Sequence, residues 1–345
     1  MKYVLGDADK LVSIIKDHYL SPYVISSQNS GITFESDNQK PKIHSIYLYP
    51  IKSCASFKVS SWCLDSASLL YDRSFVIMQG RKTLTQKILP LLCMIKPKID
   101  LKAKTMTISC PGVTEFVLGL ELFEDSKISQ IQETCVGNVC GDSIEGLDCG
   151  VEVSNWLEHA TGLQDLKLVK LIKRVQRKST NMRHDNLPKN LKSFANESQF
   201  LILNYESAKE LEKNLPIDAL EDLTFDGNEI QSRCDWIVEQ FRGNIVIRGI
   251  APFEEEKWKS IRIESDGEAK DSVTFEVHGL CTRCNVISVD QSNGDFVQEP
   301  LKTLTKMEGR KFKFGVLASL KPEAKTNCDL LHSKLSTSCD LEILR

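Results

Sequence analysis

Cys281 and Cys284 are the residues of this chain whose type and spacing best suit chemistry. They stand three positions apart with Arg283 between them, after a strand-like run at 273–277 and before another at 285–290. The thiolate is the reactive form of cysteine, and a neighbouring cation favours it. Thiolates also select soft metals rather than magnesium or calcium. The spacing therefore predicts a reactive or metal-binding thiol, with a pair of buried structural thiols as the alternative.

Three further segments place a cation beside apolar, strand-like residues. They are 49–54 with Lys52, 71–74 with Arg73, and 241–247 with Arg242. Arginine can bind phosphate through two parallel hydrogen bonds, and lysine supplies a point charge. Each cation taken singly is an ordinary surface charge. If these three and Arg283 converge in space, they form an anion pocket beside a thiolate, which suggests a metal cofactor that carries a phosphate.

The composition is that of a globular protein with two packed units. The chain has 345 residues, 41% hydrophobic and 26% charged, with a net charge of −3 that argues against a general nucleic-acid binder. Its apolar runs stay well short of the roughly 18 residues that span a bilayer, and the N-terminus turns acidic before any signal-like stretch. We therefore expect a cytoplasmic protein without a membrane or nucleic-acid partner, and we expect most of its twelve cysteines to be buried free thiols.

Several familiar chemistries have no motif in this sequence. Phosphate-binding loops, zinc-protease helices, nucleophile elbows and dinucleotide fingerprints each require a characteristic spacing of residues. None of these spacings occurs in the chain.

Hydrophobic periodicity predicts many short strands and a few helices. Strands are expected at 43–49, 57–63, 74–78, 95–101, 105–109, 200–204, 245–250, 261–263, 273–277 and 285–290. Helices are expected at 9–20, 151–161 and 207–215. A basic stretch at 167–183 indicates a surface linker, and residues 321–345 are expected to fray. Short strands at this regular spacing favour an antiparallel barrel or sandwich.

The four segments that carry cations and thiols, in this order, resemble the MOSC family, named after the C-terminal domain of molybdenum cofactor sulfurases. The first half of the family pattern is met by YPIKSC at 49–54, YDR at 71–73, and LTQ at 84–86 followed by Pro90. The second half is met by FRGN at 241–244, CTRC at 281–284, VDQSNG at 289–294 and FG at 314–315. The match covers about residues 43–320, and the ordered set is far more specific than any single motif.

The resemblance implies a mainly β (α+β) fold in which an N-terminal β-barrel unit packs on a MOSC β-barrel unit, with a few helices. The expected boundaries are a helix and linker at 1–42, the N-terminal barrel unit at 43–165, a basic linker at 166–189, the MOSC domain at 190–320 and a tail at 321–345. The cofactor is expected between the two units.

The functional residues of the family carry over to matching positions of this chain. Cys284 aligns with the cysteine that ligates the metal in the reductase branch, so the resemblance implies that it is the catalytic residue and the metal ligand. Cys281 is the weaker alternative ligand. The residues expected to bind the molybdenum cofactor, a molybdenum ion on a phosphate-bearing pterin, are Lys52, Ser53, Arg73, Asn196, Ser198, Arg242, Asn244, Thr282 and Arg283.

Within the family, the chain looks closer to the C-terminal part of the eukaryotic sulfurases than to the amidoxime-reducing branch. The closer resemblance rests on VCGD at 139–142, DCG at 148–150, NESQF at 196–200 and FEEEKW at 253–258. Sulfurases of this branch add a terminal sulfur to the oxo form of the cofactor, which activates xanthine dehydrogenase and aldehyde oxidase.

The sulfur in that branch comes from a persulfide made on a separate NifS-like domain that depends on pyridoxal phosphate. This chain has about 40 residues before its first barrel strand, and none of its lysines can be assigned as a Schiff-base lysine. The resemblance therefore implies the molybdenum cofactor as ligand, a separate persulfide donor as partner, and the two molybdenum enzymes as recipients. Whether this chain is itself a sulfurtransferase stays open. The alternatives are an amidoxime-type reductase that uses external electrons, a non-catalytic carrier of the cofactor, and a β protein with incidental thiols.

Overall fold

In a computed structural model, the structure describes residues 40–123, 134–139, 142–171, 198–216, 232–264, 272–307, 309, 312–321, 333–337 and 339–345. The expected helix at 9–20, Asn196 and most of the expected basic linker lie outside these residues. The helices of the described residues are all too short or too polar to cross a membrane.

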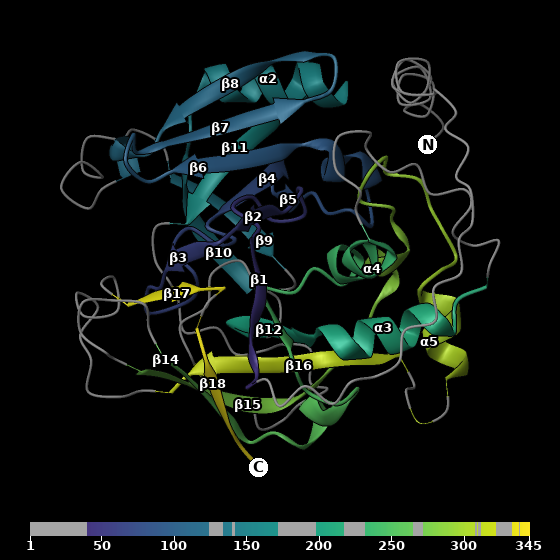
Figure 1. The fold of residues 1–345 in the computed structure, drawn as a ribbon. Coiled ribbons are helices and arrows are strands. Elements are labelled where there is room, and N and C mark those ends of the chain that lie inside the picture. The colour runs from purple at the N-terminus through teal and green to yellow at the C-terminus, as the bar shows by residue number, and fades with distance from the viewer. Residues whose placement is uncertain are drawn as a thin grey trace.

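The largest element is an eight-stranded sheet in the lower part of Figure 1. Its strands, in spatial order, are β18 (Leu341–Leu344), β14 (Ser260–Glu264), β15 (Ser272–Thr282), β16 (Lys313–Leu320), β12 (Phe200–Asn204), β13 (Ile245–Arg248), β1 (Lys42–Leu48) and β2 (Phe57–Val59). Neighbours are antiparallel except β12 and β13, which run parallel and therefore need a crossover connection. The crossover contains α3 (Tyr205–Lys213) and α4 (Arg233–Phe241), which pack on each other.

Five other strands close into a small barrel. They are, in order, β10 (Asp142–Asp148), β11 (Leu166–Leu171), β4 (Phe75–Gln79), β5 (Lys82–Thr83) and β9 (Thr134–Val139). At the top of Figure 1, a three-stranded sheet of β6 (Lys96–Asp100), β7 (Thr105–Cys110) and β8 (Val113–Gly119) lies beside α2 (Val151–Thr161). We call these elements the barrel unit, and the eight-stranded sheet with its helices the large-sheet unit.

The remaining elements are short. β3 (Ser61–Cys63) pairs with β17 (Lys334–Ser336), and α5 (Leu301–Lys306) precedes β16. Single turns of 3-10 helix are η1 (Pro90–Met94), η2 (Glu121–Phe123), η5 (Glu254–Lys257) and η6 (Asn285–Ser288).

Local sequence explains where α4 begins and ends. The Ser232 hydroxyl accepts a hydrogen bond from the backbone N–H of Asp235 at 3.1 Å, which satisfies one of the free donors of the first turn. The apolar side chains of Trp236, Ile237 and Phe241 recur at helical spacing and are buried. The helix ends at Arg242, which takes the left-handed conformation with φ 55°. This ending turns the Arg242 side chain out of the helical row and towards the barrel unit.

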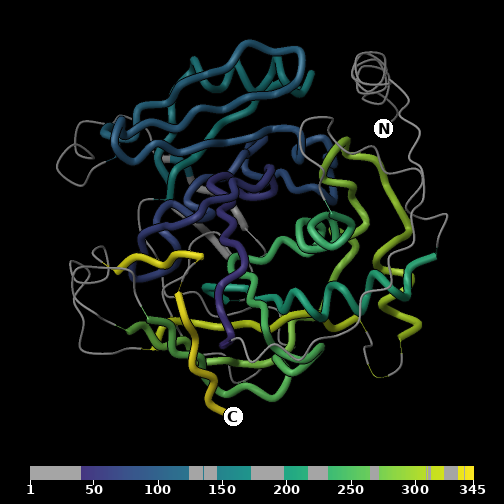
Figure 2. The backbone as a smooth tube through the Cα atoms, viewed as in Figure 1, coloured from purple at the N-terminus to yellow at the C-terminus, as the bar shows by residue number. Residues whose placement is uncertain are grey.

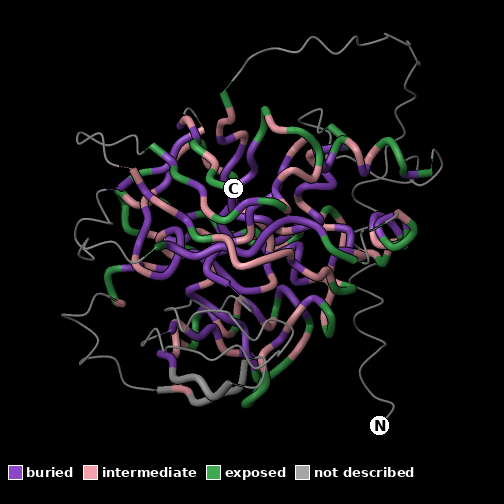
Figure 3. Tube along the Cα trace, turned by 90° about the horizontal axis from the view of Figure 1, so that it is seen from below, coloured by how far each residue is buried: buried purple, intermediate pink, exposed green. Residues whose placement is uncertain are grey.

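One hydrophobic core runs through both units. It joins Ile46 of β1, Phe75 of β4, Leu168 of β11, Phe200 of β12 and Phe275 of β15, each at most 1% exposed. Figure 3 shows buried residues along the middle of the molecule in the described segments. A second core, between the sheet and its helices, holds Leu203, Leu211, Trp236, Phe241 and Phe314. The shared core keeps the two units in one fixed arrangement.

The structure confirms the mainly β class and changes the grouping of strands. β1 was expected in the barrel unit, but it pairs with β13 of the large-sheet unit, Lys42 opposite Arg248. β11 occupies the first six residues of the expected linker at 166–189 and pairs with β4 and β10. Strand partners are chosen by packing between distant segments, which periodicity within one segment does not reveal.

Two expectations for individual segments are wrong. The run at 285–290 was expected to be a strand, but η6 forms there, with the Ile287 N–H donating to the Cys284 carbonyl at 3.2 Å. Within the tail at 321–345, β17 and β18 are paired strands rather than frayed chain. Figure 2 shows these yellow segments lying against earlier parts of the chain. Leu335 is fully buried, and its burial stabilises a strand that the polar residues around it do not predict.

Candidate functional site

The segments at 49–54 and 71–74 lie side by side next to β4 of the barrel unit. The Lys52 N–H donates to the Phe75 carbonyl at 2.8 Å, and the Phe75 N–H donates to the Pro50 carbonyl at 3.0 Å. The Arg73 N–H donates to the Tyr49 carbonyl at 2.8 Å. These backbone bonds bring Lys52 and Arg73, which are 21 positions apart in the sequence, to the same edge of the barrel unit. Lys52 is buried, at 6% exposed.

Arg73 connects this edge to the large-sheet unit. Its Nη1 donates to Asp72 Oδ2 at 2.6 Å and to Asn244 Oδ1 at 3.0 Å. Its Nη2 donates to the Arg242 carbonyl at 3.2 Å. The left-handed backbone of Arg73, φ 47°, sends the guanidinium across the interface while Asp72 stays buried behind it.

Arg242 makes the reciprocal connection from the large-sheet unit. Its Nη1 donates to Gln291 Oε1 at 2.7 Å, and its Nη2 donates to the Cys54 carbonyl at 2.8 Å. The guanidinium groups of Arg242 and Arg73 both lie over the ring of buried Tyr49, at 4.4 and 4.6 Å from its centroid. The negative face of an aromatic ring stabilises a cation. The Tyr49 ring therefore stabilises two guanidinium groups that lie close together.

Asn244 is 1% exposed and uses both ends of its amide. Its Oδ1 accepts from Arg73 and, at 3.3 Å, from the Leu201 N–H, and its Nδ2 donates to the Tyr47 carbonyl at 3.3 Å. The resemblance implies that Asn244 binds the cofactor. In the structure, its hydrogen bonds connect β1, β12 and the Arg73 side chain. The observed contacts therefore make Asn244 an internal support of the cation cluster.

The CTRC segment begins in the last two residues of β15, and Arg283 connects it to Phe241, the residue before Arg242. The Arg283 Nη1 lies 3.1 Å from Cys281 Sγ, its Nη2 donates to the Phe241 carbonyl, and the guanidinium lies 5.1 Å from the centroid of the Phe241 ring. In extended backbone, residues two apart share a side and residues three apart face opposite sides. The contact of Arg283 with Cys281 follows this rule, and Cys284, which is also extended, is the only exposed thiol among the described cysteines.

The other predicted residues are placed as follows. Ser53 adjoins Lys52 with a left-handed backbone, φ 69°, and Thr282 pairs with Lys313 at the end of β15. The Ser198 hydroxyl donates to the Ala318 carbonyl at 2.6 Å, so it is used within the sheet. Asn196 lies outside the described residues. The structure thus brings together the segments of Lys52, Arg73, Arg242 and Arg283, and it ties Ser198 to β16 instead.

Sequence reasoning missed a polar network behind Arg242. Buried Gln86 donates to Gln291 Oε1 at 2.9 Å, and the Gln291 Nε2 donates to the Val289 carbonyl at 2.9 Å. Asp290, 1% exposed, accepts from the N–H of Ser292 at 3.0 Å and from its hydroxyl at 2.8 Å. The LTQ and VDQSNG motifs contain these residues, but the motifs served only as part of the family pattern and no role was predicted for their side chains.

Burial governs the charge states around the site. Burial raises the pKa of Asp72, and the Arg73 guanidinium opposes that rise. Burial lowers the pKa of Arg242. The buried thiols of Cys54 and Cys93 have raised pKa values for the same reason, about 12 for Cys93. These thiols therefore stay protonated and inert, which leaves exposed Cys284 as the accessible thiol of the site.

The residues present fit an anionic ligand. Four cations, Lys52, Arg73, Arg242 and Arg283, stand against two buried carboxylates, Asp72 and Asp290, so positive charge is in excess. Among the described residues, the Arg283 Nε is buried without a hydrogen-bond partner. A buried donor left unpaired costs free energy unless another group accepts from it. A phosphate-bearing metal cofactor matches the charge of the cluster and the thiol beside it.

Comparison with known proteins identifies the two halves of the chain. The MOSC N-terminal beta barrel domain matches residues 40–164, and the MOSC domain matches residues 190–328. The chain belongs to the MOSC family. Strand β1 shows that the two MOSC domains share a sheet as well as an interface, since residues of the first domain pair with β13 of the second.

Curated relatives with MOSC similarity are molybdenum cofactor sulfurases. Molybdenum cofactor sulfurase 2 of Culex quinquefasciatus is 32% identical over 94% of this chain and 41% of its own length. The Bos taurus sulfurase is 35% identical over 84% of this chain and 31% of its own length. This MOSC chain therefore spans about two fifths or less of the length of these relatives. The YUAD protein from Bacillus subtilis covers 88% of the chain at 9% identity, with a TM-score of 0.33.

Proposed function

We propose that this chain binds the molybdenum cofactor and serves its sulfuration, in which a terminal sulfur is added to molybdenum. The observation that carries the proposal is that Arg73 and Arg242 share the ring of buried Tyr49, while the Lys52 backbone adjoins Phe75 and Arg283 donates to the carbonyl of Phe241, the residue before Arg242. Cys284, the residue after Arg283, is exposed. Guanidinium and ammonium groups suit the phosphate of the cofactor, and a thiolate suits molybdenum. The similarity to sulfurases supports sulfuration as the reaction.

In this proposal, each residue has a definite task. Lys52 and the two arginines on Tyr49 supply the positive field that holds the anionic cofactor. Arg283 anchors the CTRC segment to the Phe241 carbonyl, so that Cys284 stands in a fixed position as the metal ligand. Asp72, Asn244 and Gln291 hold the arginine side chains by accepting from their N–H groups. Ser53, Thr282, Ser198 and Asn196 remain predicted cofactor contacts.

The proposed source of the sulfur is a persulfide carried by a cysteine desulfurase domain or protein. Xanthine dehydrogenase and aldehyde oxidase are the proposed recipients. A reducing compartment such as the cytoplasm suits a site that depends on free thiols.

The test is the molybdenum and pterin content of the protein purified from a host that accumulates the cofactor. Wild type, Cys284→Ala and Cys63→Ala are compared, since Cys63 is a half-buried thiol on β3. Each preparation is then used to reconstitute a sulfur-free xanthine dehydrogenase. Bound, sulfurated cofactor that falls in Cys284→Ala but not in Cys63→Ala supports the proposal.

Other outcomes separate the alternatives. Bound cofactor without sulfur, together with turnover of N-hydroxylated substrates, would establish the reductase alternative. Bound cofactor with neither activity would establish a carrier. Absence of bound cofactor in wild type would overturn the proposal.

A further inference from the structure

A groove of about 560 Å³ opens next to Cys284. Its walls come from η6, the loop before α5, α5 itself and the residue before β16; the lining includes Asn285, Ser288, Phe296, Leu301, Lys302 and Phe312. Asn285 follows Cys284 directly, and the Arg283 N–H donates to the Phe312 carbonyl at 2.6 Å. The groove therefore begins at the residue that follows the exposed thiol, and its Phe312 end is bonded to the residue that precedes the thiol.

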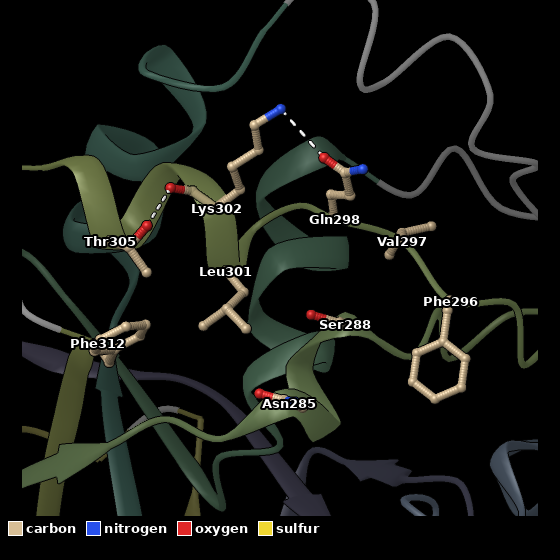
Figure 4. A pocket seen from close by; sticks show the side chains of 9 residues that line it. All are labelled: Asn285, Ser288, Phe296, Val297, Gln298, Leu301, Lys302, Thr305 and Phe312. Atoms are coloured by element: carbon tan, nitrogen blue, oxygen red, sulfur yellow. Dashed lines mark hydrogen bonds between the residues drawn. The ribbon is translucent and has the colours of Figure 1, made fainter.

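The groove presents unusually exposed apolar side chains. Phe296 is 65% exposed and Phe312 is 46% exposed. Figure 4 shows these two rings at opposite ends of the row, with Leu301 and Ser288 between them. Exposed aromatic and aliphatic groups around a hollow are typical of protein interaction sites, where aromatic residues contribute much of the binding free energy.

The charge of the groove indicates which kind of segment binds there. The lining includes Lys302 and no carboxylate, and Lys306 follows one helical turn later on the same exposed side of α5. Lys302 is held in place by Gln298, whose Oε1 accepts from the Lys302 Nζ at 3.2 Å. A segment that combines an apolar side chain with acidic neighbours complements this surface.

The size of the contact distinguishes the two partners of the proposed reaction, the sulfur donor and the recipient enzyme. The recipient enzyme has to take up a whole cofactor, which needs a broad contact over the cation cluster. The donor has to present only one sulfur atom, which a short segment can do. A groove of 560 Å³ accommodates a few side chains, as a short segment presents, and not the broad face of a whole enzyme. It therefore suits an anchor for the donor segment.

We infer that the groove between Phe296 and Phe312 is the docking site of the persulfide donor. It takes an acidic segment with an apolar anchor that places the persulfide beside Cys284. This inference rests on the proposed function, because it assumes that sulfur arrives from another protein. Phe296, Phe312 and Leu301 bind the apolar anchor, and Lys302 and Lys306 attract the acidic residues.

The test measures binding of the part of the Culex quinquefasciatus sulfurase that this chain does not match, purified and incubated with L-cysteine and pyridoxal phosphate to load the persulfide. The full chain is immobilised as wild type, as Phe296→Ala/Phe312→Ala and as Lys302→Glu/Lys306→Glu. The matched controls are Ile88→Ala/Val117→Ala, two apolar residues 66% and 59% exposed elsewhere, and Lys98→Glu/Lys102→Glu. Thermal unfolding checks that every variant is folded.

Both groove variants are expected to weaken donor binding by about tenfold or more, and both controls to leave it within about twofold. Binding by wild type should weaken with added salt, because the lysines contribute through charge. The cofactor content of all variants should equal that of wild type, which keeps this test separate from that of the proposed function.

Two results would overturn the inference: wild type that does not bind the donor, or groove variants that bind it like wild type. Wild type without cofactor but with groove-dependent donor binding would instead refute the proposed function alone.

Discussion

Arg73 of the barrel unit donates a hydrogen bond to the side-chain oxygen of Asn244 in the large-sheet unit at 3.0 Å, across 171 positions of sequence. The same guanidinium pairs with Asp72, which is fully buried. The cation cluster is therefore part of the interface between the two units, and a change in the cluster affects stability as well as ligand binding.

Replacement of Arg73 by glutamine leaves the Asp72 carboxylate buried without its ion pair. The Arg73 side chain is only 14% exposed, so solvent cannot replace it well. We expect a loss of about 3–5 kcal/mol in the free energy of unfolding, measured by urea denaturation. Arg248→Gln, at an exposed position on β13, serves as control and should change stability by at most about 0.5 kcal/mol. The double variant Asp72→Asn/Arg73→Gln should recover part of the loss; no recovery would contradict the role of the buried charge.

Gly315 is expected to tolerate no side chain. Its φ is 74°, and an added Cβ would lie 2.6 Å from Leu203 Cδ2 and 2.8 Å from the Ile202 carbonyl oxygen. Gly112 has the same conformation, φ 75°, with open space around the position of a Cβ. Gly112→Ala should cost about 1–2 kcal/mol from the left-handed backbone alone. Gly315→Ala should cost clearly more because the clash adds to it, and equal losses in chemical denaturation would refute this packing argument.

The free energy of unfolding is expected to depend on pH through Glu255. This residue is 1% exposed and accepts from Asn204 Nδ2 at 2.9 Å and from the Ser207 hydroxyl at 2.8 Å. Burial raises its pKa above the ordinary value. Since the folded pKa lies above the unfolded one, the contribution is complete below the unfolded value of about 4.3 and is lost as pH rises through the folded pKa.

The stability of wild type relative to Glu255→Gln should therefore be greatest near pH 4 and fall towards pH 8. Urea denaturation of both proteins across this range measures the difference. A difference that grows with pH would mean that the carboxylate is stabilised in its charged form, contrary to the expectation from burial.

Thiol reactivity should separate Cys284 from the buried cysteines. In native protein at pH 8, iodoacetamide is expected to label Cys284 first, because it is exposed. Cys54 and Cys93 are fully buried with raised pKa values, so they should react only after unfolding in urea. Mass spectrometry of peptides measures the order, and Cys284→Ser should remove the fast adduct. Rapid native labelling of Cys93 would contradict the packed interface.

Periodicity predicted those helices and strands that can be identified from their own residues, without knowing which elements they pack against. α2 spans 151–161 as expected, with Val153 and Leu157 buried, and β12 spans 200–204 as expected. The failure at 285–290 has a physical cause: Val286, Ile287 and Val289 favour a strand locally, but the chain must turn after Cys284, and η6 buries Ile287 instead. The tail strands were missed because β3 and β14, their partners, lie far away in the sequence.

The candidate site was predicted in part. Residue types identified Lys52, Arg73, Arg242 and Arg283 as cations at strand ends, and the structure brings their segments together. Gln86, Gln291 and Asp290 were missed, since amides and a turn aspartate have ordinary local roles. The bond from Arg242 to Gln291 and the bond from Gln86 to Gln291 mark the two amides as supports of the site, and Asp290 is marked by its burial and its bonds from Ser292.

The sequence by itself determined the family and the mainly β class, because these depend on the order and spacing of residues within short segments. The tertiary structure alone decided that β1 belongs to the large sheet and that Tyr49 carries two arginines. It also decided that Cys281 contacts Arg283 while Cys284 is exposed, next in sequence to a residue that lines a groove. The physical reason is that hydrogen bonds and burial between distant segments are set by the packing of the whole chain, which no local pattern contains.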